Sequence, residues 1–218
     1  KRQPTIVLAA LHDLVLAGEA PSLAAAFASA SNTTHPDAGP GGARVGEVAV
    51  EVLVGMAGSV LERVRGRTLR ADEGGRHALL YPAIGEVARR VGAGSAGLID
   101  VGRSAALNLT VDRVGIAYGN GQSLGDPASA VQAAASVVHD GRVPAVAMPE
   151  IVARVAVGGD LVDVTDAAEA RWLRACVPPD QVDRLAQLEA ELELAAADPP
   201  VLVQARWLRS YRRRLREC

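Results

Sequence analysis

The sequence is short of aromatic residues and of cysteine, and both shortages limit what the protein can be. Phe, Trp and Tyr make up 3% of the 218 residues, so any core must consist mainly of Ala, Val and Leu. The two cysteines, Cys176 and Cys218, are too few for a disulfide framework and fit a reducing compartment, so we expect a cytoplasmic protein. No His and Cys residues stand at metal-ligand spacing, so we expect no metal site.

Long apolar runs and a strong net charge are also lacking. No apolar run reaches the ~20 residues that a membrane-spanning helix needs, so no membrane span is expected. Residues 1–11 combine a basic start with an apolar run, but His12 and Asp13 interrupt the run and no small-residue cleavage site follows, which indicates a helix rather than a signal peptide. The net charge of −2 argues against general affinity for nucleic acid.

Positive charge is concentrated at one end of the sequence. Residues 204–218 hold six arginines and one acid. An apolar stripe at helical spacing runs through the same segment and consists of Trp207, Leu208, Tyr211 and Leu215. The pattern indicates a terminal helix with an uncovered apolar side, and contact with an acidic membrane surface or with nucleic acid is the alternative.

Hydrophobic residues make up 49% of the chain, which is enough to bury a sizeable core. A loop rich in Gly and Pro is expected at residues 31–43. The apolar spacing predicts helices over residues 4–18, 22–29, 45–65 and 74–91. We therefore expect a helical domain over residues 1–93.

The apolar period changes after this point. The spacing predicts a strand over residues 95–101 with a helix directly behind it, a β-rich stretch at 152–164 and a strand at 201–204. A helix over 166–196, interrupted at Pro178 and Pro179, separates the last two, and residues 114–142 look irregular. Strand and helix in alternation predict an α/β fold, in which the helical N-terminal layer precedes an incomplete Rossmann-like parallel sheet over residues 94–218.

The turn after the first predicted strand, DVGRS, is the main candidate for a ligand site. Glycine at position 102 allows the backbone to approach a ligand closely, and N–H groups at the start of the next helix would point toward it. Asp100, at the end of the strand, can accept a hydrogen bond from a ligand amine or hydroxyl. The other interpretation is a buried strand that runs into a buried helix without a ligand.

The run LIDVGRSAALNLTVDR at residues 98–113 resembles the E-V-G-x-S-A-G-L-N-L-x-x-D-R block of the bacterial DUF2332 family. Three further stretches fit the same family, at residues 72–84, 125–129 and 149–200. The resemblance implies a fold like that of S-adenosylmethionine-dependent methyltransferases, with S-adenosylmethionine as the expected cofactor. It implies no particular substrate.

The resemblance assigns roles to matched residues of the turn. Asp100 and Gly102 are expected beside the methionine part of the cofactor, and Ser104 at the start of the following helix. Asn108 is expected to face the cleft or to brace that helix, and so are Asp112 and Arg113. Together these residues would form the cofactor side of the site.

Two residues of the helical domain match the family's N-E-x-x-R signature. Glu73 and Arg76 are therefore the candidates for catalytic residues, as a wall on the substrate side of the cleft. Because they stand three positions apart, an ion pair on a helix surface is the structural alternative.

The sequence departs from the family block at several cofactor positions. Ala106 replaces a glycine, and Gly158 replaces the acid expected to bind the ribose hydroxyls. Asp160 is the expected substitute for that acid, although two residues along a strand displace a carboxylate by about 6–7 Å. The resemblance ends near residue 204, where relatives continue with further strands, so we expect a truncated or frame-shifted terminus or a short paralogue.

Two functions from different classes follow from these observations. One is transfer of a methyl group from S-adenosylmethionine to an unknown small molecule, at a weakened cofactor site. The alternative is a non-catalytic relative that acts as a binding or interaction protein, because an incomplete sheet leaves apolar surface for a second copy or a partner protein to cover. A dehydrogenase is disfavoured, since no G-x-G-x-x-G motif is present.

Overall fold

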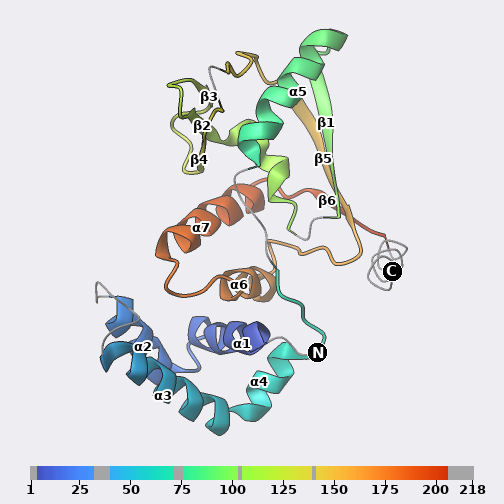
Figure 1. Cartoon of the computed structure of the whole chain (residues 1–218). Helices are drawn as coiled ribbons and strands as arrows, with labels where there is room; N and C mark the ends of the chain where they lie inside the picture. The colour runs from blue at the N-terminus through green and yellow to red at the C-terminus, as the bar shows by residue number, and fades with distance from the viewer. Residues whose placement is uncertain (1–3, 32–39, 71–75, 103–104, 139–140, 206–218) are drawn as a thin grey trace, which may run out of the picture. The chain divides into compact units, whose positions relative to one another are not determined.

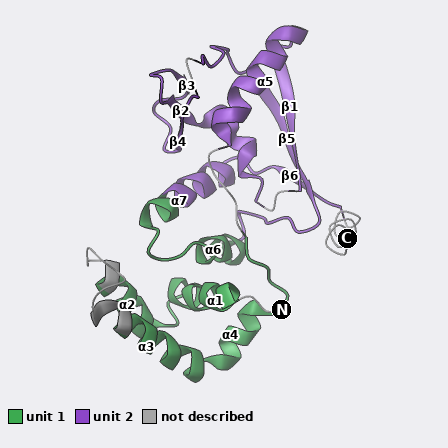
Figure 2. Cartoon of the chain, viewed as in Figure 1, with its two compact units in different colours: residues 1–71, 167–186 green, residues 72–166, 187–218 purple. Residues whose placement is uncertain are grey.

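The computed structural model describes residues 4–31, 40–70, 76–102, 105–138 and 141–205. The chain forms two compact units, shown in different colours in Figure 2: residues 1–71 with 167–186, and residues 72–166 with 187–218. Helices make up the first unit, and helices with two small sheets make up the second (Figure 1). The expected α/β class is confirmed.

The helical unit begins with α1, for which the prediction is confirmed. Pro4 occupies the first turn of α1 (Pro4–Leu16), and Gly18, with a φ of 75°, follows its end. The chain continues through α2 (Pro21–Ser31), α3 (Pro40–Gly55), α4 (Ala57–Val64) and, much later, α6 (Ala167–Ala175).

Two boundaries in the helical unit differ from the expectation. The helix predicted at 45–65 is two helices, because Met56, with φ of −118° and ψ of 28°, leaves helical geometry between α3 and α4. The loop predicted over 31–43 ends earlier, since α3 already begins at Pro40, where proline suits a first helical turn.

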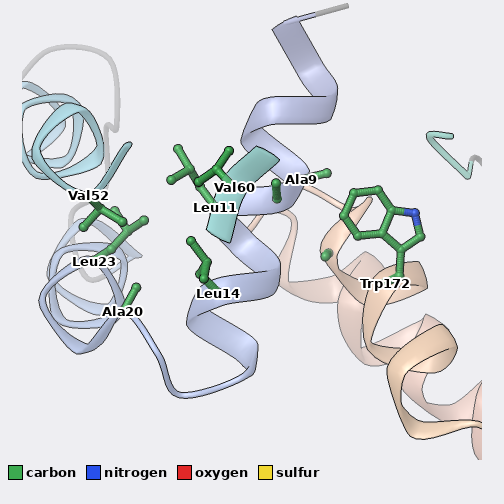
Figure 3. Packing of buried hydrophobic residues seen from close by; sticks show 10 residues of the cluster. Ala9, Leu11, Leu14, Ala20, Leu23, Val52, Val60 and Trp172 are labelled. Carbon is green, nitrogen blue, oxygen red and sulfur yellow. The ribbon is translucent and has the colours of Figure 1, made fainter. Parts of the chain in front are cut away.

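The core of the helical unit consists of small and aliphatic side chains around one tryptophan. Figure 3 shows Leu11 and Leu14 of α1, Leu23 of α2 and Val52 of α3 in this cluster. Trp172 of α6 is 2% exposed, and its indole N–H donates a hydrogen bond to the Thr68 carbonyl at 3.0 Å. Trp172 is the largest fully buried side chain among the described residues.

A buried charge cluster also holds the helical unit together. The Asp13 side chain is 1% exposed and accepts hydrogen bonds from Arg63 at 2.8 Å and Arg171 at 3.0 Å. Next to it, the His12 Nδ1–H donates to the Val177 carbonyl at 3.0 Å. Asp13 therefore connects α1 to α4 and α6, and His12 connects α1 to Val177, just beyond the end of α6.

The second unit contains a three-stranded parallel sheet with the order β1-β5-β6. Its strands are β1 (Ser95–Val101), β5 (Glu150–Gly158) and β6 (Val201–Gln204). The predictions of strands at 95–101 and 201–204 are confirmed. β5 begins at Glu150, earlier than predicted, and ends at Gly158, where the two glycines interrupt the β-rich run.

Helices flank the parallel strands in sequence. α5 (His77–Val91) precedes β1, and α7 (Val182–Ala196) precedes β6. The predicted interruption at Pro178 and Pro179 is confirmed, since α6 ends at Ala175 and α7 begins at Val182. α5 lies in the same compact unit as the sheets and α6 in the helical unit, so the units differ from the single boundary expected between residues 93 and 94.

The two faces of the parallel sheet differ in burial. On one face, Ala156 is fully buried and packs with Ala106, Leu109 and partly buried Leu98 and Leu202. The register places Ile99, Val155 and Val201 in one row of the other face, with Val101, Val157 and Val203 in the next. The exposed fractions on β1 and β6 are 68% for Ile99, 59% for Val101, 65% for Val201 and 45% for Val203.

A second small sheet occupies part of the stretch expected to be irregular, so that expectation is wrong. β2 (Gly115–Tyr118) lies between β3 (Ser123–Gly125) and β4 (Gln132–Ala135), antiparallel to the first and parallel to the second. Strands of three or four residues carry too little apolar alternation to be recognised in sequence. Burial raises the pKa of Tyr118, whose hydroxyl donates to the Ala78 carbonyl at 2.6 Å.

Candidate functional site

The candidate site begins where β1 ends. Asp100 is the next-to-last residue of β1 and is half-buried, whereas its neighbours Ile99 and Val101 are exposed. Gly102 has a φ of 85°, a conformation that glycine adopts without strain. Its N–H donates to the Val157 carbonyl of β5 at 2.8 Å, so this amide continues the sheet ladder rather than pointing at a ligand.

The helix predicted directly after this turn is a short 3-10 helix, η1 (Leu107–Arg113). Ala106 precedes it with φ of 52° and ψ of 30°, in the left-handed region that disfavours residues with a Cβ. The Leu107 carbonyl accepts hydrogen bonds from Thr110 Oγ1 at 2.8 Å and from His77 Nε2 at 3.2 Å. Both side chains thus bind one carbonyl group in the first turn of η1, and the element is a tight 3-10 helix rather than the predicted α-helix.

A pocket of about 380 Å³ lies between the end of β1, η1 and α5. Its walls are mainly apolar and come from all three elements. It is lined by Arg76, Leu80, Ile84, Leu98, Ile99, Asp100, Val101, Asn108 and Leu109. A concave, mostly apolar space with a few convergent polar groups is the usual form of a small-molecule site.

The polar groups of this pocket include three of the residues that the sequence predicts for the site. Asn108 Nδ2 donates a hydrogen bond to Asp100 Oδ2 at 3.3 Å and so joins η1 to β1. Arg76, at the start of α5, lines the same pocket. The carboxylate, the amide and the guanidinium can together bind a ligand that carries both an ammonium and a carboxylate.

Apolar residues of α5 complete the pocket, and they were not predicted as site residues. Leu80 and Ile84 stand four positions apart, so they share one face of α5. In sequence this spacing indicates core packing only. Because their partners Leu98 and Leu109 come from distant segments, no local pattern could have assigned these residues to a pocket.

The ion pairs behind the pocket brace it and do not line it. Arg154 of β5, whose side chain is 8% exposed, donates to Asp112 at 2.6 Å and to Asp198 at 2.8 Å. It also donates to the Leu109 carbonyl at 3.0 Å, and Arg113 pairs with Asp198 as well. Of the two roles open to Asp112 and Arg113, the contacts therefore favour bracing of η1 over facing the cleft.

A family model described as an uncharacterized protein conserved in bacteria (DUF2332) matches residues 1–218. The chain belongs to the DUF2332 family. The match includes residues 204–218, which lie beyond the point where the residue patterns predicted the resemblance to end. No curated protein and no solved structure matches the chain.

The remaining residues implied by the DUF2332 resemblance lie elsewhere. Gly158 is buried at the end of β5, and its carbonyl accepts a hydrogen bond from the Ala205 N–H at 2.7 Å. Asp160 is exposed, and neither residue lines the pocket. Glu73 and Ser104 lie outside the described residues.

The part of the chain that the structure describes holds no candidate metal cluster and no single helix that could span a membrane. No group of three or more His, Cys, Asp and Glu side chains there could hold a metal ion. No single helix there is long and apolar enough to cross a membrane. Only α1 and α2 taken together have the length and apolar composition of a membrane span, and the two helices are bent by 102° relative to each other.

Proposed function

We propose that the pocket at the end of β1 binds S-adenosylmethionine and that the protein transfers its methyl group to a small molecule. One observation carries the proposal: a single pocket of about 380 Å³ is lined by Arg76, Asp100 and Asn108. The resemblance of residues 98–113 to the DUF2332 block implies a place on the cofactor side for Asp100 and Asn108, and the N-E-x-x-R signature implies a substrate-side place for Arg76. The pocket also lies at the carboxyl end of a parallel strand, where α/β proteins commonly bind ligands.

The residues present fit the amino-acid part of this cofactor. The Asp100 carboxylate can accept a hydrogen bond from the cofactor's ammonium, and Arg76 can pair with its carboxylate. Asn108, bonded to Asp100, holds the acceptor oxygen in place. The bound cofactor supplies a methyl group on a positively charged sulfur, which is the electrophile of the reaction.

The residues fit the ribose part less well. Gly158 offers no carboxylate for the ribose hydroxyls, and Asp160 lies outside the pocket lining. Because bidentate contacts to the ribose would be missing, we expect weaker binding than in sites that have such an acid.

Catalysis by this pocket would rest on positioning rather than on a dedicated base. The apolar lining residues Leu80, Ile84, Leu98 and Leu109 would shield a bound acceptor from water, and a desolvated acceptor held close to the methyl group reacts faster. Arg76 borders the same space, but in this arrangement it would hold the cofactor's carboxylate rather than the acceptor. The proposed second catalytic residue, Glu73, lies outside the described residues.

Calorimetric titration of the purified chain with S-adenosylmethionine and with S-adenosylhomocysteine tests this function. We expect saturable binding of both, and weaker binding of methionine and of adenosine, which each carry half of the contacts. A folded chain that binds neither cofactor form at millimolar concentration would rule out the methyltransferase function.

The second candidate function is that of a non-catalytic interaction protein. A specific observation favours it: four β-branched side chains on β1 and β6, between 45% and 68% exposed, leave one face of the parallel sheet apolar. Such a surface is typical of a contact with another protein.

A further inference from the structure

Strand β1 has a partner on only one side among the described strands. β5 pairs with it along residues 95–101, and the sheet order β1-β5-β6 places β1 at the edge. An edge strand leaves a row of N–H and C=O groups that can form hydrogen bonds with another extended chain. Seven residues make a long edge in such a small sheet.

The register shows which backbone groups are on the open side. Gly102 donates its N–H to the Val157 carbonyl of β5, and the Gly94 carbonyl accepts from the Glu150 N–H. The backbone N–H and C=O groups of the even-numbered β1 residues therefore point toward β5. Backbone groups alternate in direction along a strand. The N–H and C=O groups of Gly97, Ile99 and Val101 therefore point away from β5, toward the open edge.

The open edge lacks the usual devices that prevent strand pairing. β1 reads SAGLIDV and contains no lysine, arginine or proline. The extra residue in its pairing with β5 is Val152, on β5, so the backbone of β1 itself is continuous. Ile99 and Val101 are more than half exposed, which adds apolar surface to the edge.

The pocket follows the same edge. Residues 98–101 all line it, although successive side chains of a strand point to opposite faces. Four consecutive residues can border one space only where that space runs along the side of the strand. The edge of β1 is therefore accessible along the half that contains the bulky residues.

We propose that β1 pairs in antiparallel fashion with β1 of a second copy of the chain, about a two-fold axis through Leu98. Small residues, Ser95, Ala96 and Gly97, fill the first half of the strand, and bulky residues fill the second. Antiparallel pairing about Leu98 places Ile99 opposite the partner's Gly97 and Val101 opposite the partner's Ser95. The bulky half of each strand thus lies opposite the small residues of the partner strand.

The same register avoids charge repulsion and satisfies the backbone. Asp100 lies opposite the partner's Ala96, so the two carboxylates are four residues apart along the strand, or about 13 Å. Ile99 and the partner's Gly97 both direct their backbone groups to the open edge, so they exchange two hydrogen bonds. If the axis passed between two residues, each odd-numbered residue, whose backbone groups face the open edge, would lie opposite an even-numbered residue, whose groups face β5. No hydrogen bonds could form in that register, so it is excluded.

Because the pocket runs along the same edge, the partner strand would occupy part of it, and pairing would compete with a ligand for that space. The partner's Ala96 and Gly97, which have the smallest side chains of the strand, would lie beside Asp100 and Ile99. The inference does not rest on the proposed function, because a strand edge can pair whether or not the pocket binds a cofactor.

Sedimentation of the full chain over the micromolar range tests the pairing. We expect a reversible dimer, and we expect Ile99→Pro to weaken it about tenfold or more, since proline removes an N–H at the open edge and leaves the β5 ladder intact. Ile99→Lys, which keeps that N–H, should weaken it through charge near the axis. Circular dichroism and thermal unfolding check that both variants remain folded.

Val201→Lys is the matched control, because it changes the exposed face on β6 without touching the edge of β1. We expect it to leave the dimer unchanged. A wild-type chain that stays monomeric would overturn the proposal. A dimer that Val201→Lys weakens and Ile99→Pro does not would also overturn it, in favour of contact between apolar faces.

Disulfide trapping tests the register independently. In a Cys218→Ser background, Leu98→Cys should form a cross-linked dimer on mild oxidation, because Leu98 faces itself at a Cα separation near 4.5 Å. Ala96→Cys should not, since the two copies of position 96 would be about 13 Å apart. Equal cross-linking at both positions, or at neither, would contradict this register.

Discussion

The Asn108 side-chain amide donates a hydrogen bond to the Asp100 carboxylate at 3.3 Å, and this contact joins the 3-10 helix η1 to the end of strand β1. Both residues line the same pocket as Arg76. The contact fixes the Asp100 carboxylate, yet one carboxylate oxygen remains able to accept a further hydrogen bond. The proposed function depends on that remaining capacity.

Asp100→Asn should lower the affinity for S-adenosylmethionine about tenfold or more, because the amide carries no negative charge for the cofactor's ammonium. Stability should change little, since the residue is half-buried at a strand end. Titration calorimetry measures the affinity, with Asp180→Asn, the same change at an exposed loop residue, as control. Equal affinity in both variants would remove Asp100 from the site.

Ala106→Gly should leave the free energy of unfolding equal to that of the wild type or raise it. Ala106 has a φ of 52°, and glycine would relieve the strain of this left-handed backbone, which costs about 1–2 kcal/mol. This gain offsets two losses: the contacts of the alanine methyl group, and the greater conformational entropy that glycine gives the unfolded chain. Ala88→Gly, at a similarly buried position inside α5, should instead lower it by about 1 kcal/mol or more. Urea unfolding compares the two, and equal losses would show that Ala106 is not strained.

Arg154→Met should destabilise the fold by about 3 kcal/mol, because it leaves Asp112 without its buried partner. Arg89→Met removes the charge from a side chain that is 64% exposed, and it should change stability far less because solvent screens this pair. Urea unfolding of both variants measures the difference. If the two variants lose equal stability, Arg154 does not brace η1.

Protonation of His12 should destabilise the fold below neutral pH. Burial lowers the pKa of His12 below its ordinary value of 6.5, so the unfolded chain binds the proton more readily than the folded one. The free energy of unfolding should therefore fall as the pH drops from 6.5 toward the lowered pKa. His12→Asn should show a smaller fall over this window in urea unfolding. An unchanged pH dependence in the variant would assign the effect to other groups.

The sequence predicts those parts of the fold that depend on local pattern. The run Ser95–Val101 is apolar and lies between glycines, so its strand is found at the predicted residues. Pro178 and Pro179 interrupt a helical pattern, and the helix does break there. Asp100 and Asn108 could be predicted for a common site because the family block contains both.

Long-range features could not be predicted in the same way. The pairing of Arg154 with Asp112 joins residues far apart in sequence, and neither shows its partner locally. The strands β2, β3 and β4 are too short for a visible alternation of apolar residues. Leu80 and Ile84 look like ordinary core positions of a helix until η1 and β1 are placed beside them.

Photolabelling shows whether the pocket at the end of β1 is the cofactor site. The chain is irradiated with S-adenosylmethionine that carries a radioactive methyl group, and the labelled peptides are identified after digestion. We predict label within residues 76–84 or 98–109, and a loss of this label in Asp100→Asn. Label confined to other peptides, or equal labelling of the variant, would show that this pocket is not the cofactor site.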